Sequence, residues 1–168
     1  MKRDHKYALL IATCAFLSVA VIGCSTLNPV SQGVALIGSD KGAVEKSFGK
    51  PTDVYQFSDG TTRWFYSTQP AGYQSYAADF DSNGKLSSFR QTLVEKELYK
   101  AKIGVWTKTD VERSFGRPRE AVKNYSIEKI EVWSYRVFLN GGQPGHFYFY
   151  FDDKGVLRST DVDVDILY

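Results

Sequence analysis

Apolar residues at helical spacing occur in two octets that are almost identical. The first reads V-E-K-S-F-G-K-P at 44–51, and the second reads V-E-R-S-F-G-R-P at 111–118. In each octet the Val and the Phe stand four residues apart and therefore share one helical face. The glycine that follows, Gly49 or Gly116, suits the left-handed position after a helix, and the proline beyond it forbids continuation. The octets predict two short helices that end at equivalent points.

Capping residues predict where these helices begin. Thr109 is followed by Glu112 in the spacing of a capping box, whereas Gly42 precedes Glu45 at the same spacing as a weaker start. Every residue of the octet has a capping or packing role, so the motif predicts architecture rather than chemistry. The expected helices cover 30–37, 40–48, 94–102 and 109–115.

Alternation of apolar and polar residues predicts β-strands in the remainder of each half. Turn signals such as Ser58-Asp59-Gly60 and Ser82-Asn83-Gly84 separate these strands, as hairpins require. Helices followed by antiparallel strands indicate an α+β fold, with the helices on one face of a sheet. The expected strands cover 54–57, 61–68, 73–80, 86–93, 120–125, 129–139, 146–151 and 157–166.

The two halves match beyond the octets, which indicates an internal duplication. W-F-Y at 64–66 corresponds to W-S-Y at 133–135, and F-D-S-N-G-K-L at 80–86 corresponds to F-D-D-K-G-V-L at 151–157. The offset grows from 67 to 69 and then 71 residues, because turns absorb insertions while strands keep their register. The recurring Trp/Tyr pair is expected in the core. The expected division is a signal peptide at 1–23, a tether at 24–35, and units at 36–93 and 94–168.

The N-terminus has the composition of a bacterial targeting segment. A basic start precedes an apolar run over 7–22, which is short for a transmembrane helix. The run ends in Val21-Ile22-Gly23-Cys24, which resembles the lipobox of bacterial lipoproteins. The resemblance implies lipidation of Cys24 and a mature chain that begins there. Two or more acyl chains anchor a protein stably. An Asp directly after the Cys would resemble an inner-membrane retention signal, so Ser25 at this position favours the outer membrane.

Composition narrows the classes of function. The chain is 43% hydrophobic and 15% aromatic, so it can bury a core. Without residues 1–23 it carries 18 basic and 18 acidic residues, which gives no electrostatic basis for nucleic-acid binding. Cys14 and Cys24 are the only cysteines, which excludes zinc frameworks of Cys and His.

The order of the motifs resembles the SmpA/OmlA lipoprotein family, which has the BamE-like fold. A short capped helix, F-G-x-P, W-x-Y and F-D-x-x-G-x-L follow one another, and this chain carries the set twice. The resemblance implies helices packed on a three- to four-stranded antiparallel sheet in each unit. A tandem pair also resembles the β-lactamase inhibitor protein, whose units form one concave sheet. Single-copy family members are accessory lipoproteins of the outer-membrane barrel-assembly machine, whereas this chain is duplicated.

The run F-Y-F-Y-F at 147–151 is the most distinctive sequence of the second half. Side chains of a strand alternate between faces, so Tyr148 and Tyr150 point to the open face if the three Phe cover the helices. Their equivalents in the first half, at the offset of 71, are Ala77 and Asp79. Tyr on a sheet suits protein recognition, but it also simply covers β-surfaces, and both interpretations stay open.

The remaining charged residues form no complete catalytic or metal-binding pattern. Asp161, Asp163 and Asp165 make one strand face acidic, and three carboxylates on one strand do not close a calcium shell. We interpret them as a solvated face that discourages edge pairing. His146 is the only imidazole after His5, and no nucleophile-elbow motif accompanies it. We therefore expect no enzyme, no cofactor and no metal site.

The sequence thus predicts a lipid-anchored protein on the periplasmic face of the outer membrane. It is expected to be a non-catalytic binding or scaffold module with an envelope protein as partner, and the family resemblance implies a role in outer-membrane protein assembly. The alternative is an enzyme-inhibitor-type protein in which a loop, 69–73 or 140–145, plugs an active site. A third hypothesis is a lipoprotein hydrolase that uses His146.

Overall fold

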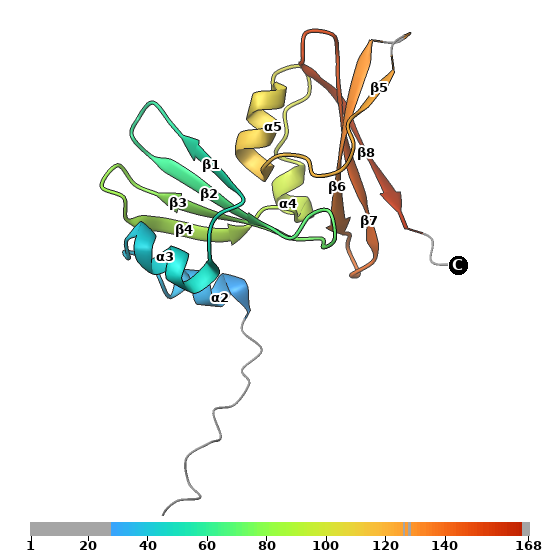
Figure 1. The fold of residues 1–168 in the computed structure, drawn as a ribbon. Helices are drawn as coiled ribbons and strands as arrows, with labels where there is room; N and C mark the ends of the chain where they lie inside the picture. The colour runs from blue at the N-terminus through green and yellow to red at the C-terminus, as the bar shows by residue number, and fades with distance from the viewer. Residues whose placement is uncertain (1–27, 126, 128, 166–168) are drawn as a thin grey trace, which may run out of the picture.

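The computed structural model describes residues 28–125, 127 and 129–165, which fold into two units of the same design (Figure 1). Each unit has two short helices and a four-stranded antiparallel sheet, so the expected α+β class and the tandem arrangement are confirmed. The strand orders are β1-β2-β3-β4 and β5-β6-β7-β8, so hairpins join all neighbouring strands. Cys24 and the expected signal peptide lie outside the described residues.

The elements of the two units follow the same sequence along the chain. The first unit comprises α2 (Pro29–Val34), α3 (Lys41–Phe48), β1 (Asp53–Gln56), β2 (Thr62–Ser67), β3 (Ser75–Phe80) and β4 (Leu86–Gln91). The second comprises α4 (Glu95–Leu98), α5 (Lys108–Phe115), β5 (Lys123–Tyr125), β6 (Ile130–Phe138), β7 (Pro144–Phe151) and β8 (Leu157–Val164).

Helix α2 belongs to the first unit, which corrects the tether expected at 24–35. Asn28 caps the helix by accepting a hydrogen bond from the Val30 amide at 3.0 Å, and Pro29 occupies the first helical position. Both are helix-start residues rather than linker residues. The helix packs on β4, with Gly33 directly against the ring of Phe89. The first unit therefore begins at the Asn28 cap.

The caps of α3 and α5 also differ from those expected. Asp40 caps α3, and Thr107 forms a reciprocal capping box with Asp110 at the start of α5. Each cap also forms an isolated β-bridge to a turn residue outside the strands, Asp40 with Lys85 and Thr107 with Val156. The capping pairs predicted from the sequence are therefore wrong: Gly42 with Glu45, and Thr109 with Glu112.

The glycines that end α3 and α5 have the expected positive φ but an extended ψ. Gly49 has φ 80° and ψ −166°, and Gly116 has φ 86° and ψ 174°. This region is essentially reserved for glycine and lies outside the left-handed helical basin that we expected. Each amide still closes the helix, by donating to the carbonyl of Glu45 or Glu112 at 2.8 Å.

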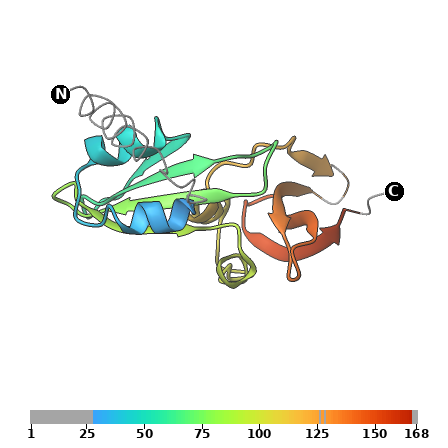
Figure 2. The ribbon, with the colours of Figure 1, turned by 90° about the horizontal axis from the view of Figure 1, so that it is seen from below.

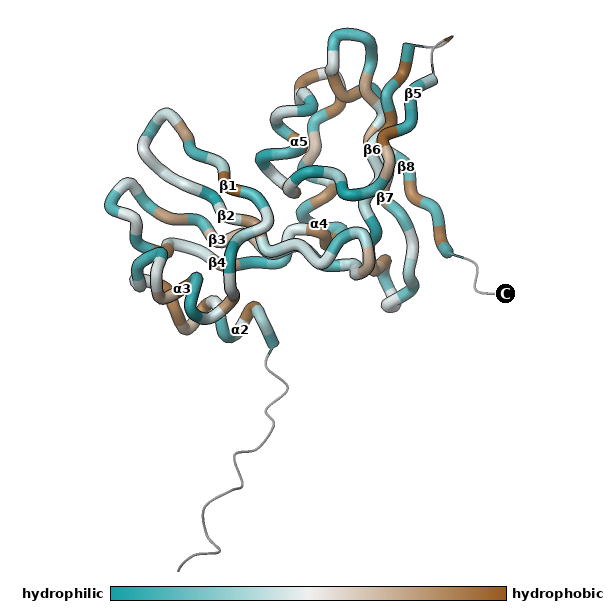
Figure 3. Tube along the Cα trace, in the orientation of Figure 1, coloured by the Kyte–Doolittle hydropathy of each residue, from teal (hydrophilic) through white to brown (hydrophobic). Residues whose placement is uncertain are grey.

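Each sheet packs one face against its own helices to form a separate core. Hydrophobic residues alternate with hydrophilic ones along β8, as a strand with one covered face requires (Figure 3). The Trp/Tyr pairs lie in these cores as expected, although Trp64 is only partly buried. The first core contains Val44, Tyr66, Tyr76, Ala78, Phe80, Leu86 and Phe89, and the second includes Val111, Phe115, Trp133, Tyr135, Phe147, Phe149, Phe151 and Leu157.

Helix α5 lies between the two sheets, which remain separate (Figures 1 and 2). The carbonyl of Phe115, at its end, accepts a hydrogen bond from the Ser75 hydroxyl of β3 at 3.3 Å. Arg63 of β2 donates to the carbonyl of Arg113 at 2.8 Å. Helices α2 and α3 leave one face of the first sheet open, and the second unit therefore packs on that face. The single concave sheet implied by the inhibitor resemblance is not formed.

Candidate binding face of the second sheet

The two sheets differ in the face that points away from their own helices. In β3, Ala77 is fully buried beneath the second unit. In β7 the equivalent position is Tyr148, and the equivalent of Asp79 is Tyr150. No described helix packs on this face of the second sheet (Figure 1), although the loop at 69–73 contacts its Arg136 and Phe138 end and Glu120 contacts Ser134. The duplication thus places aromatic residues on the open face and small or paired ones on the covered face.

Tyr148 and Tyr150 point away from the helices, as the alternation predicted. The three Phe of β7 are fully buried on the opposite face, while the two Tyr are only partly buried. Their ring centroids are 6.4 Å apart, and the ring of His146 stacks 5.9 Å from Tyr148. Burial, followed by the charges of nearby carboxylates, raises the pKa of both phenols, so they stay neutral hydrogen-bonding groups. The result is a row of three rings along one strand.

Neighbouring strands add charged residues beside this row. Asp161 pairs in register with Tyr148, and Asp163 pairs with His146, so both carboxylates of β8 share the open face. On the other side, Lys123 of β5 pairs with Val132, which itself pairs with Tyr150. Together these strands shape a shallow depression of about 320 Å³. It is lined by Lys123, Tyr125, Val132, Tyr148, Tyr150, Asp161, Val162 and Asp163.

His146 lies at the end of the row, between two carboxylates. Its Nε2 is 3.1 Å from Glu120, and its Nδ1 is 3.0 Å from Asp165. Glu120 also accepts a hydrogen bond from the hydroxyl of Ser134. The imidazole thus has a carboxylate at each nitrogen, and the hydroxyl of Ser134 donates to Glu120 instead of to the ring. A Ser/His/Asp arrangement requires the serine to donate to the imidazole, so this geometry does not support the hydrolase hypothesis.

The antiparallel strand register could have placed the neighbours of Tyr148 and Tyr150 from the sequence. Counting antiparallel pairs from Tyr150 leads to Val132 and then to Lys123, which the sequence analysis did not single out. The contacts of Glu120 could not have been found this way, because it lies in the loop before β5. Within the described ranges, no group of three His, Cys, Asp or Glu side chains is arranged to hold a metal ion.

The loop at 69–73 is not free to insert into another protein. The side-chain amide of Gln69 donates to the carbonyl of Arg136 at 2.6 Å and accepts from its amide at 3.1 Å. The guanidinium of Arg136 stacks 4.3 Å from the ring of Tyr73, and that ring packs against Phe138. This loop therefore joins the two units. The loop at 140–145 is shorter than expected, because β7 already begins at Pro144.

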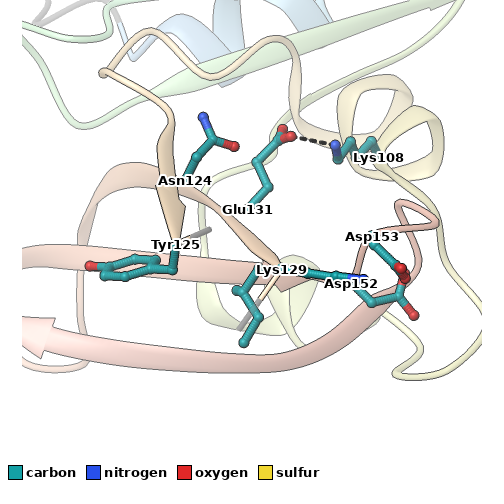
Figure 4. Close-up of a pocket in the computed structure, with 8 residues that line it drawn as sticks. Lys108, Asn124, Tyr125, Lys129, Glu131, Asp152 and Asp153 are labelled. Atoms are coloured by element: carbon teal, nitrogen blue, oxygen red, sulfur yellow. Dashed lines mark hydrogen bonds and ion pairs between the residues drawn. The ribbon is translucent and has the colours of Figure 1, made fainter. Parts of the chain in front are cut away.

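A second depression, of about 290 Å³, lies beside β5 and the turn after β7 (Figure 4). Three of its charged residues, Lys108, Glu131 and Asp152, already have structural partners. Lys108 pairs with Glu131, and Asp152 accepts hydrogen bonds from the amides of Lys154 and Val156 at 3.0 and 2.9 Å. Burial alone would raise the pKa of Glu131, but Lys108 and Trp133 hold it below its usual value. We therefore centre the site on the open face instead.

No protein-family model and no curated protein matches the chain. Among solved structures, it is similar to an extracellular protein containing a SCP domain from Bacillus anthracis str. Ames. The identity is 16% and the TM-score is 0.30, over 79% of this chain and 45% of that protein. The chain thus spans less than half of that protein, and a score this low carries no argument about fold or function. Among the described residues, no helix has the length and hydropathy needed to cross a membrane.

Proposed function

We propose that this protein is an outer-membrane lipoprotein, anchored through Cys24, whose second unit binds an envelope protein without catalysis. The observation that carries the proposal is the difference between the two sheets. The face of the first sheet is covered by α5, while the equivalent face of the second carries Tyr148 and Tyr150 and has no described helix over it. Rigid aromatic side chains with a polar tip are enriched where proteins bind one another.

The charges of this face favour a partner that presents Lys or Arg side chains. Asp161 and Asp163 flank the aromatic row, and both are exposed. A cation that reaches the depression could approach an aromatic ring and a carboxylate together, which combines cation–π and ion-pair attraction. Lys123 is the single basic residue lining the depression.

The repeated helix–helix–sheet order supports placing both units with the BamE-like fold of the SmpA/OmlA lipoproteins. The glycines and prolines of the octets end α3 and α5 at equivalent points, as the motif requires. Outer-membrane protein assembly is then the process in which a partner is first sought. The fold assignment and this process are proposals that rest on the motifs.

A photo-crosslinking experiment tests the binding face. A photoreactive phenylalanine is placed at Tyr148 or at Tyr150 of the full chain, with the exposed hairpin residue Asn83 as the matched control position. Adducts with one envelope protein are expected from the two Tyr positions and not from Asn83. Equal adducts at all three positions, or none at the Tyr positions, would refute the proposal. A soluble hydrolase as the adduct would instead favour inhibitor-type binding.

Charge reversal sharpens this test. Asp161→Lys together with Asp163→Lys is expected to abolish the adducts, because the partner's cations would be repelled. Arg158→Glu, on the same strand but outside the depression, is the matched control and should leave them unchanged. Anchoring is tested separately with Cys24→Ala or globomycin. Unchanged precursor size and membrane fractionation would show that Cys24 is not lipidated.

A further inference from the structure

Tyr66 and Tyr135 are equivalent residues of the two units with opposite surroundings. The hydroxyl of Tyr135 donates to the carbonyl of Gly116 at 2.8 Å, and the side chain is 1% exposed. Tyr66 is 9% exposed, and its hydroxyl is buried without a hydrogen-bond partner. Burial, and next the charge of Glu45, raise the pKa of Tyr66 to about 12, so the phenol keeps its proton. An unpartnered buried hydroxyl costs free energy, which calls for a partner that residues 28–125, 127 and 129–165 do not supply.

Tyr66 lines a pocket of about 310 Å³ between the helices and the sheet of the first unit. Phe48 of α3, Tyr76 of β3 and Pro29 of α2 form apolar walls. The ring of Phe48 lies 5.4 Å from that of Tyr66, so both belong to one aromatic surface. This volume is at the lower end of the range found for small-molecule sites. A small apolar group therefore fits against the aromatic surface of Phe48 and Tyr66, whose hydroxyl is closed to solvent in this structure.

The two threonine hydroxyls of the pocket already have partners within the protein. Thr52 donates to the carbonyl of Phe65 at 3.0 Å, and Thr68 donates to that of Gln74 at 2.9 Å. Lys50, at the rim, is exposed and pairs with no carboxylate among the described residues. The pocket thus offers apolar walls, a rim cation and, where the Tyr66 side chain turns toward it, a hydroxyl donor with no partner among the described residues.

We propose that this pocket binds an acyl chain headed by a carbonyl group, such as a fatty acid. The chain lies against the aromatic walls, and the carbonyl oxygen accepts a hydrogen bond from Tyr66. A carboxylate at the rim is attracted by Lys50. A peptide strand fits less well, because its many backbone groups need partners and the hydroxyls of Thr52 and Thr68 are engaged. The proposal does not depend on the open face of the second sheet.

Fluorescence titration of the full chain with 11-(dansylamino)undecanoic acid tests the pocket. Saturable binding is expected, and Tyr66→Phe should weaken it about fivefold, because one hydrogen bond to the carbonyl is lost. The same substitution in the second unit, Tyr135→Phe, is the matched control and should leave probe affinity unchanged. Displacement by saturated fatty acids should tighten about fourfold per added methylene until the pocket is full.

The stability of the same two variants separates this proposal from a purely structural role. Tyr66→Phe should leave the denaturation midpoint unchanged or raise it, because it removes an unpaired buried hydroxyl, whereas Tyr135→Phe should lower it. Failure of the probe to saturate, or equal affinity in Tyr66→Phe and the parent chain, would overturn the proposal.

The source of the acyl chain is resolved by comparing laurate with methyl laurate as competitors. Stronger competition by laurate that Lys50→Gln removes indicates a free fatty acid. Equal competition that is insensitive to Lys50→Gln indicates an esterified chain, such as that of a phospholipid. Both results support an acyl ligand, and absence of competition by either contradicts it.

Discussion

The two units share a backbone design but place their large core side chains differently. In the first unit, Gly33 of α2 lets the ring of Phe89 approach the helix directly, and Ala78 is the register partner of Phe89. The equivalents of Phe89 and Ala78 in the second unit are Thr160 and Phe149, so the large side chain has moved from the edge strand to the inner strand. Exchanges that conserve total volume are tolerated in cores when the pattern is kept. The two units therefore keep the same hydrogen-bonded strand arrangement, while their core side chains differ.

The same comparison applies to the opposite faces of the sheets. Ser75 and Ala77 are small enough to lie under α5, whereas His146 and Tyr148 would leave no room for a helix at that distance. The face of the first sheet thus packs against the neighbouring unit, and the equivalent face of the second is the one that we propose binds a partner. Equivalent positions of a duplicated fold can be compared in this way without any other sequence.

The largest loss of stability is expected from disrupting the packing of α5, the helix between the two sheets. Phe115 is buried, stacks with Phe149 at 5.5 Å and ends the helix that covers the first sheet. Phe115→Ala should cost about 3–5 kcal/mol in the free energy of unfolding, measured by urea denaturation. Phe48→Ala, at the equivalent and partly exposed position, should cost about 1–2 kcal/mol less. Equal losses would contradict the special position of α5.

A smaller loss is expected from adding one methyl group to α2. A Cβ at position 33 would collide with the ring of Phe89, so Gly33→Ala should destabilise the chain by about 2–3 kcal/mol. Combining it with Phe89→Leu should recover part of that loss, because the smaller side chain makes room. A double-mutant cycle by thermal denaturation measures this coupling. Additive effects would show that the two residues do not share the contact.

Loss of the ion pairs of Asp79 should give the next largest loss of stability, and this loss should depend on pH. Burial alone would raise the pKa of this carboxyl, but Arg63 and Arg90 outweigh it and hold the pKa below its usual value. The stabilisation is therefore present above the unfolded pKa of about 3.9 and is lost as pH falls through the folded value. Asp79→Asn should cost roughly 1.5 kcal/mol at pH 7.

This difference from the parent chain should shrink in urea denaturation below about pH 4, as the parent carboxyl is protonated. The matched position in the second unit is Tyr150, and Tyr150→Phe should show no such acid dependence. A penalty for Asp79→Asn that stays constant down to pH 3 would argue against the ionic contribution.

The smallest effect on stability is expected on the open face. Asp161→Asn and Asp163→Asn should each change the free energy of unfolding by less than about 0.5 kcal/mol, because both side chains are exposed. Circular dichroism during thermal unfolding measures this. A larger loss would mean that the carboxylates support the fold, and the face would then lose its role as a free binding surface.

Local patterns predicted the elements well and the packing between units poorly. The octets placed the ends of α3 and α5, and alternation placed Tyr148 and Tyr150 on the correct face, because both rest on short-range periodicity. The predicted capping pairs were wrong, since the caps are Asp40 and Thr107, which form bridges to the distant residues Lys85 and Val156. No local pattern shows that α5 covers the first sheet.

Strand β5 is much shorter than β6, so the backbone of Arg136 lies beyond its last pair. The side-chain amide of Gln69 occupies this position and reproduces the two hydrogen bonds of a missing strand residue. A second unit produced without the first would expose these groups to any other extended chain. By pairing with this edge, the first unit thus protects the second unit from self-association.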